Sequence, residues 1–355
     1  MAAIQPGELA RNNYNPVKYS FVPMEAGEQH VLTSDPWSFL SAQLQAKLPT
    51  KKGTNRANIE RAFHYARLAE EFYSAAENTP LPAKGTLVYY GMLNLVKCYL
   101  SANKVELEKS YEHHGLQLPL GKKGTIQAKK PSAPSHINIF AKFSDHLGKP
   151  VAADIEFDLK SALAHVPEIH GIYSSTTNEK RKLLPVNIEF LVNDKRNRMF
   201  TEISFKKEQE YKVDCTKFHK GERASYFQDG APKEGMVVYR SKSKKGFNKD
   251  NISRKYKNIL TEYEAFDVVS ILTRQGYRYY IDLKPGSFPA LCYSLAAMFY
   301  LGSAARYRPV EMESVLKGEL RPVITELISV TPKQFLYQLV SHITQKECVI
   351  PSSAL

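Results

Sequence analysis

Six polar side chains interrupt or adjoin two otherwise apolar segments, and their chemical types suit the binding of an anion. Lys97 and Arg306 carry the ammonium and guanidinium donors that fit phosphate or carboxylate groups. His114 adds a group that can transfer protons near neutral pH. If the two apolar segments pack together, we expect some of these side chains to converge on one anion cleft. The set is Tyr90, Asn94, Lys97, His114, Arg306 and Arg308.

A structural role is the simpler explanation of these residues, and we favour it over a ligand site. Asn94 and Lys97 would satisfy buried backbone groups, and Arg306 would pair with Glu311 or Glu313 across a helix junction. An isolated buried ammonium group is too costly to keep, so Lys97 must be neutral, be paired to a carboxylate such as Glu311 or face a cavity.

Positive charge is concentrated in residues 240–257. Eight lysines and arginines stand there against the single acid Asp250, a net charge of +7 in 18 residues. Such a charge density suits a polyphosphate partner, although a solvated lysine-rich loop is the alternative. A second basic stretch spans 122–130. The residues expected to contact nucleic acid are Arg240, Lys242, Lys244, Lys245, Lys249, Arg254, Lys255 and Lys257.

A third pattern is typical of metal-dependent nucleases. Asp282 and Lys284 form an acid-x-Lys triplet at the end of a predicted strand, and Asp267 precedes it, as in restriction-type nucleases that hold magnesium. The triplet is common by chance, and we expect Asp267 to lie on a helix. Cys215 and His219 have no second half of a zinc site nearby. We therefore expect no metal site and no cofactor.

Helical periodicity at both ends of the chain indicates the elements that position these residues. Segments 36–48, 54–76 and 86–103 are predicted helices, and the last is apolar nearly all round, which is typical of a buried helix. Residues 288–305 form a second such helix, and we predict that it packs against 86–103. A final helix is expected to begin at Thr331 and Pro332.

Between the helical parts the pattern changes to a period of two. Residues 185–206 are typical of a β-hairpin, and 137–143, 236–240 and 277–281 are further predicted strands. Helical spacing returns over 256–272, with Gly276 as the C-terminal cap. The pattern predicts an α+β fold. We expect an N-terminal arm and first helix over 1–50 and a helical core over 51–117 and 287–355. A basic, β-rich insertion should occupy 118–286.

Composition limits the class of protein. The chain has 355 residues, a formal charge of +13 and 43% hydrophobic residues, enough for a sizeable core. Its four cysteines show no paired spacing, which favours a reducing compartment. No basic-then-apolar leader opens the chain, and the uncharged run 288–305 contains Pro289 and Gly302, which favours a core helix over a membrane span. We expect a cytoplasmic protein without a membrane partner.

Several motifs in the helical parts resemble those of YaaC-like bacterial proteins. The run from Pro82 to Leu100, the triplet at 114–116 and the segment 300–309 occur in the order found in that family. The resemblance covers about half of the chain and implies an architecture, because the family has no settled activity to carry over. The segment 69–92 is also similar to the helical hairpin of HEPN domains, which implies a HEPN-like helical bundle as the core.

These observations lead to one expected function and two alternatives. We expect a protein that binds nucleic acid or a partner protein, within a bacterial defence or stress system by family analogy. The first alternative is an enzyme acting on nucleic acid or nucleotides, either a metal-dependent nuclease or a HEPN-like toxin. HEPN ribonucleases carry Arg and His four to six residues apart, and no arginine here has a histidine at that distance downstream. The second alternative is a structural subunit without a ligand.

Overall fold

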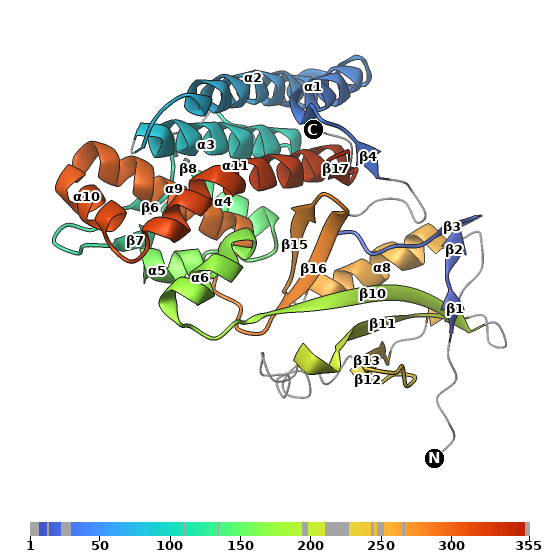
Figure 1. Ribbon diagram of the computed structural model, residues 1–355. Coiled ribbons are helices and arrows are strands. Elements are labelled where there is room, and N and C mark those ends of the chain that lie inside the picture. The colour runs from blue at the N-terminus through green and yellow to red at the C-terminus, as the bar shows by residue number, and fades with distance from the viewer. Residues whose placement is uncertain are drawn as a thin grey trace.

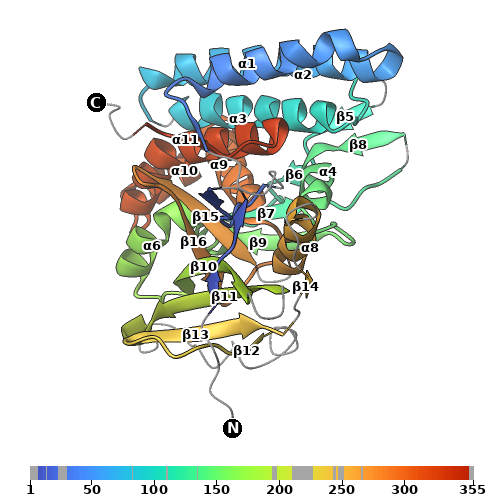
Figure 2. The same cartoon turned by 90° about the vertical axis from the view of Figure 1, so that its right-hand side faces the viewer.

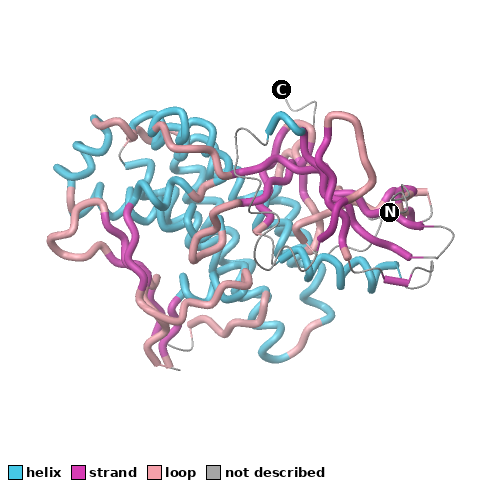
Figure 3. Tube along the Cα trace, turned by 90° about the horizontal axis from the view of Figure 1, so that it is seen from below, coloured by secondary structure: helices cyan, strands magenta, loops and turns pink. Residues whose placement is uncertain are grey.

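Most of the helices gather in one half of the molecule and the strands of the largest sheet in the other (Figure 3). The computed structural model describes residues 7–12, 14–22, 30–81, 83–108, 111–133, 135–193, 198–209, 227–242, 245–246, 252–264 and 267–351. Within these residues the helices are α1 (Pro36–Lys47), α2 (Gly53–Glu77), α3 (Ala83–Ala102), α4 (Ile139–His146), α5 (Leu159–Ala164), α6 (His170–Thr177), α8 (Ile252–Glu264), α9 (Ala290–Tyr307), α10 (Pro309–Lys317) and α11 (Arg321–Thr344).

The largest sheet is antiparallel, with the strand order β12-β13-β11-β10-β16-β15 and with β1 and β14 added beside β10 and β11. Its strands are β1 (Glu8–Leu9), β10 (Leu183–Asn193), β11 (Arg198–Lys206), β12 (Phe227–Asp229), β13 (Met236–Ser241), β14 (Lys245–Gly246), β15 (Val268–Thr273) and β16 (Gly276–Asp282). The predicted hairpin at 185–206 is confirmed, because Asn187 to Asn193 pair with Ser204 to Arg198.

Shorter strands form four small sheets. Strand β17 (Cys348–Val349) pairs with β4 (Val31–Leu32), and β2 (Arg11–Asn12) with β3 (Asn15–Pro16). Strand β5 (Tyr111–His113) pairs with β8 (His136–Asn138), while β6 (Leu116–Gln117), β7 (Thr125–Ala128) and β9 (Ile155–Asp158) make a three-stranded sheet.

Helix α3 lies at the centre of the helical half, between α2 and α9 (Figure 1). Small residues permit both contacts: a Cβ atom on Gly91 would lie 2.5 Å from Tyr73 Cδ2, and one on Gly302 would lie 3.1 Å from Thr86 Cα. The Thr86 hydroxyl donates to the Gly302 carbonyl at 3.2 Å. The predicted packing of 86–103 against 288–305 is therefore confirmed.

The buried apolar side chains form two clusters, one in each half. The first joins α1 to α6 with α9, α10 and α11, and it includes Phe140, Leu163 and Tyr173 from the segment expected to be β-rich. The second joins the large sheet to α8 and to the N-terminal arm through Val17 and Tyr19. Figure 2 shows the helical layers above the sheet. Segment 118–286 thus contains four described helices as well as strands. Among the described residues, no helix combines the length and apolar character needed to cross a bilayer.

Two sequence predictions in the middle of the chain are wrong. Residues 139–146 form a helix rather than a strand, because the Asn138 side chain accepts the Ala141 N–H at 2.9 Å and caps it. The expected helix 256–272 ends at Glu264, and 268–273 is strand β15. Gly276, with φ +91°, is at the turn of the β15–β16 hairpin. The apolar spacing near the end of the segment 256–272 fits both the helical period and the strand period of two. The β-branched run from Val268 favours the strand.

The last helix begins eleven residues before Pro332, the first helical residue that the sequence indicates. Helix α11 starts at Arg321 and contains Pro332 in its interior. Proline removes one backbone donor there. The long buried face of α11, from Val323 to Ile343, provides the packing that keeps the helix continuous.

Truncation of a buried leucine in α9 tests this core. Leu295 is 1% exposed, so Leu295→Ala should lower the free energy of unfolding by about 2–5 kcal/mol. Leu93, on α3, is only half-buried and serves as the matched control, with a smaller loss expected. Chemical denaturation measures both. An unchanged midpoint for Leu295→Ala would show that α9 is not part of the core.

Candidate functional site

Tyr90 and Arg306, two of the six residues expected in an anion cleft, are in contact where α3 meets α9, and His114 contacts α9 at another position. Arg306 Nη1 donates to the Tyr90 hydroxyl at 2.6 Å, and Arg306 Nε donates to the Gly302 carbonyl at 3.0 Å. The His114 ring packs on Phe299, on the same helix as Arg306. Desolvation, His113 and the Arg306 charge lower the pKa of His114, so the neutral imidazole is favoured.

The other three residues have separate structural partners. Asn94 Nδ2 donates to the Tyr90 carbonyl of its own helix at 2.9 Å. Lys97 pairs with Glu112 at 2.9 Å, which is one of the three states that the sequence left open, and its partner is Glu112 rather than Glu311. Arg308 donates to the backbone carbonyls of 118 and 119, at 2.9 and 2.7 Å.

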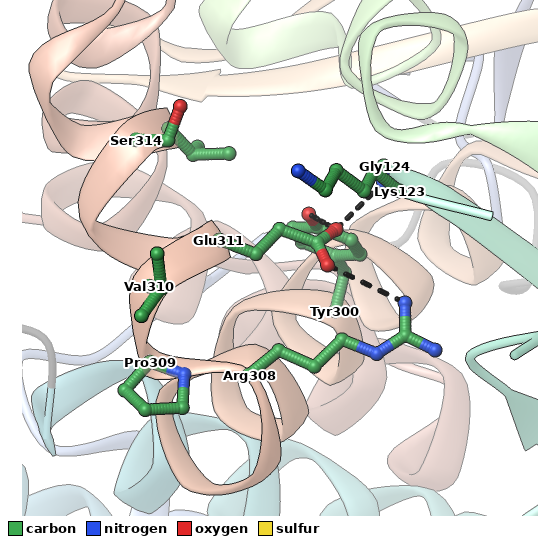
Figure 4. Close-up of a pocket in the computed structure, with 9 residues that line it drawn as sticks. Lys123, Gly124, Tyr300, Arg308, Pro309, Val310, Glu311 and Ser314 are labelled. Carbon is green, nitrogen blue, oxygen red and sulfur yellow. Dashed lines mark hydrogen bonds and ion pairs between the residues drawn. The ribbon is translucent and has the colours of Figure 1, made fainter. Parts of the chain in front are cut away.

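Glu311 accepts hydrogen bonds from the donors that line a pocket between α9, α10 and the loop at 122–124 (Figure 4). Its Oε1 accepts the Tyr300 hydroxyl at 2.6 Å and the Gly124 N–H at 2.7 Å, and its Oε2 lies 3.4 Å from Arg308 Nη1. Burial opposes ionisation, but these donors hold the pKa of Glu311 below its usual value. Arg308, rather than Arg306, therefore pairs with Glu311. The contacts of Glu311 join α9, α10 and the loop at 122–124, so this pocket has a structural role.

The described residues of the basic stretch differ in exposure. Arg240 is 5% exposed, and its Nη2 pairs with Glu202 at 2.6 Å, which excludes it from nucleic-acid contact. Lys242 is exposed, whereas Lys244, Lys249 and the side chain of Lys245 lie outside the described residues. On α8, Ile252, Tyr256 and Ile259 are buried in the second cluster. The exposed cations Arg254 and Lys257, with half-buried Lys255, occupy the rest of that helix.

The two halves enclose a cleft of about 860 Å³. Its walls come from the end of α3, the segments after α4 and α5, the helices α8, α9 and α11, and the strands β15 and β16. The titratable side chains in the lining are Asp145, His146, Lys149, His165, Glu168, Lys257, Asp267, Asp282 and His342, together with several tyrosines. A large concave site with converging polar groups is the usual place of a binding or active site. Of these side chains, only Lys257, Asp267 and Asp282 were noted in the sequence.

Lysines neutralise both aspartates of this cleft. Lys149 Nζ lies 2.5 Å from Asp267 Oδ1 and donates to the Gly286 carbonyl at 3.2 Å. Lys182 Nζ lies 3.2 Å from Asp282 Oδ2. Burial opposes ionisation of Asp282, but His165 and Lys182 hold its pKa below the usual value. Desolvation lowers the pKa of Lys182.

His165 completes this group from the helical half. Its Nδ1 contacts Lys182 Nζ and lies 3.6 Å from Asp282 Oδ2, and its ring stacks on Tyr293 with the centroids 4.4 Å apart. The imidazole is therefore held by a carboxylate, an ammonium group and an aromatic face, which fixes its orientation in the cleft.

Strand pairing places the two aspartates side by side. The Asp282 N–H donates to the Asp267 carbonyl at 3.2 Å, next to the Val268–Ile281 pair. Asp267 directly precedes β15 and has φ +50°, so its expected place on a helix was wrong. Within the described part of the chain, no three or more His, Cys, Asp or Glu side chains form a group that could hold a metal ion.

Fold and cleft define an α+β protein with a helical half and a sheet half that share one polar site. The family model of the YaaC-like proteins matches residues 28–343, and the chain belongs to this family. No curated protein and no solved structure matches the chain. The HEPN likeness of the helical core therefore stays a prediction.

Glu168 gives the cleft a pH dependence that can be measured. Desolvation raises the pKa of Glu168 to about 7. A carboxyl group whose pKa is raised on folding stabilises the folded state below its unfolded pKa, and this contribution is lost as the pH rises through about 7. Glu168→Gln should therefore gain stability relative to the wild type between about pH 5 and about pH 8.

Thermal melting at the two pH values measures this difference. The matched control is Glu179→Gln, which removes a carboxyl group that is 48% exposed. Parallel pH dependence in the wild type and in Glu168→Gln would contradict a buried, proton-binding Glu168.

Proposed function

We propose that the protein binds nucleic acid along the cleft between its two halves. The observation that supports this most directly is that Lys257 lines the cleft and belongs to the basic segment 240–257. The cleft aspartates are already paired with Lys149 and Lys182. Lys257 therefore adds positive charge to one wall of the cleft, and Arg254 and Lys255 lie on the same helix, which suits a polyanion ligand.

Salt dependence tests this proposal. Replacing Arg254, Lys255 and Lys257 together with serine should weaken binding of a labelled oligonucleotide. The slope of log K against log salt should fall by about 0.7 to 0.9 for each lost phosphate contact. Fluorescence anisotropy over a salt series measures the slope.

A matched control removes the same charge elsewhere. The triple serine variant of Arg56, Lys104 and Lys317 loses three exposed cations that lie on other elements. Its slope should equal that of the wild type. Equal slopes for both triple variants, or no binding at low salt, would contradict the proposal.

A second candidate function is metal-dependent hydrolysis of a phosphodiester in the same cleft. The pairing of Asp267 beside Asp282, two residues before Lys284, favours it. Magnesium is commonly bound by one or two carboxylates together with substrate phosphates, so two aspartates suffice when the ligand is present. A bound cation would activate water for attack on phosphorus, and the leaving oxygen would take a proton from solvent or from His165.

Asp282→Asn should abolish cleavage of a labelled single or double strand in the presence of magnesium or manganese, because it removes a carboxylate that would hold the cation. Asp267→Asn should do the same. Asp229→Asn, on the exposed edge strand β12, is the matched control and should keep the wild-type rate. Gel electrophoresis of the products measures the activity. Cleavage by both cleft variants at the wild-type rate would exclude these aspartates.

A further inference from the structure

Four side chains from three helices stack at the end of α9 that is remote from the cleft. The rings of Phe72 and Tyr90 are stacked with centroids 5.6 Å apart and 26° between their planes. The guanidinium of Arg306 lies 5.2 Å from the Tyr90 ring centroid and 4.9 Å from that of Tyr307. We name this set the aromatic–arginine stack, which consists of Phe72, Tyr90, Arg306 and Tyr307 in that order.

The guanidinium is held firmly but keeps donors for a ligand. Its Nε and Nη1 bind the Gly302 carbonyl and the Tyr90 hydroxyl, which fixes its plane. Among the described residues no carboxylate lies within ion-pairing distance of Arg306, and its Nη2 donates to none of them. Arginine presents five N–H donors in a rigid fork, so a planar cation with unused donors faces outward here.

The outer end of the stack is open to solvent. Tyr307 is 73% exposed although Arg306 covers part of its ring. Beneath the stack, the Tyr89 hydroxyl is buried and has no hydrogen-bond partner, and Tyr89 is 2% exposed. A ligand at the surface cannot reach that hydroxyl, so the open part of the stack is the exposed ring of Tyr307 with the Arg306 guanidinium beside it.

We propose that the aromatic–arginine stack binds an unpaired nucleotide of a single-stranded nucleic acid. The base stacks on the exposed ring of Tyr307, and the adjoining phosphate accepts hydrogen bonds from Arg306. Every base has a π-face, so such stacking tolerates any sequence, and guanidinium forks match phosphate geometry. This inference rests on the proposed function for nucleic acid as the ligand and narrows the ligand to a single strand.

The position of the stack sets the length of strand required. Leu291 lines the cleft near the start of α9, and Arg306 lies 15 residues further along the same helix. At a rise of about 1.5 Å per residue, the two sites are about 20 Å apart along the helix axis. A strand that reaches both sites must span at least this distance, and a mononucleotide reaches only one.

Tyr307→Ala is the decisive variant, because it removes the stacking surface and leaves Arg306 in place. The probes are a labelled homopolymeric single strand and a blunt duplex of the same length, measured by fluorescence anisotropy. We expect Tyr307→Ala to weaken single-strand binding by about 5- to 150-fold. Duplex binding should change little. Tyr307→Phe should bind like the wild type.

Two further variants complete the test. Arg306→Met should lower the salt slope for the single strand by about 0.7, the loss of one phosphate contact. Tyr111→Ala is the matched control, because Tyr111 is 69% exposed on a different element and should not affect binding.

The outcomes distinguish this inference from the proposed function. If Tyr307→Ala binds the single strand like Tyr111→Ala while the α8 triple variant loses binding, the inference about the stack is overturned and the proposed function stands. If the wild type binds neither probe, both fail. If Tyr307→Ala leaves single-strand binding intact but abolishes association with another protein, the stack is a protein-docking site and the inference is overturned.

Discussion

The close approach of α3 and α9 is the constraint on which the whole helical half depends. Gly302 allows the α3 backbone at Thr86 to come into contact, and the Thr86 hydroxyl joins the two helices. The same contact brings Arg306 onto Tyr90 at one end of α9 and sets the start of α9 against the cleft at the other. A Cβ atom at position 302 would lie 3.1 Å from Thr86 Cα, so a side chain there would require the α3 backbone to shift relative to α9.

Charge pairing is the second constraint, because it keeps a cleft with buried acids compatible with folding. Lys149 follows α4 in the helical half, whereas its partner Asp267 precedes β15 in the sheet half, so this pair also ties the halves together. Removing one member of such a half-buried pair leaves an uncompensated charge. A ligand that brings its own charge can replace a partner: a phosphate would compete for the lysines and a cation for the aspartates.

Sequence patterns predicted the elements that are long and regular. Several periods of the pattern are present in the apolar runs of α3 and α9 and in the alternation of β10 and β11. Patterns of this length indicate the type of secondary structure clearly, and the tertiary packing agrees with it. The run from Ile139 to Phe143 is too short to distinguish a strand from a helix, and the Asn138 cap decides it. For Lys97 the need for a partner followed from burial. The identity of Glu112 did not, because its position depends on the pairing of β5 with β8.

The cleft was missed for a related reason, which concerns register. Asp267 and Asp282 are 15 residues apart, and they become neighbours only when β15 and β16 pair so that Val268 faces Ile281. With Asp267 placed on a helix, the acid-x-Lys triplet had no upstream partner and was weighed as a chance pattern. A site assembled across strands is specified by their register, and a shift of one residue would turn its side chains to the opposite face. Asp267 has a positive φ, which an aspartate tolerates, and it directly precedes the strand β15.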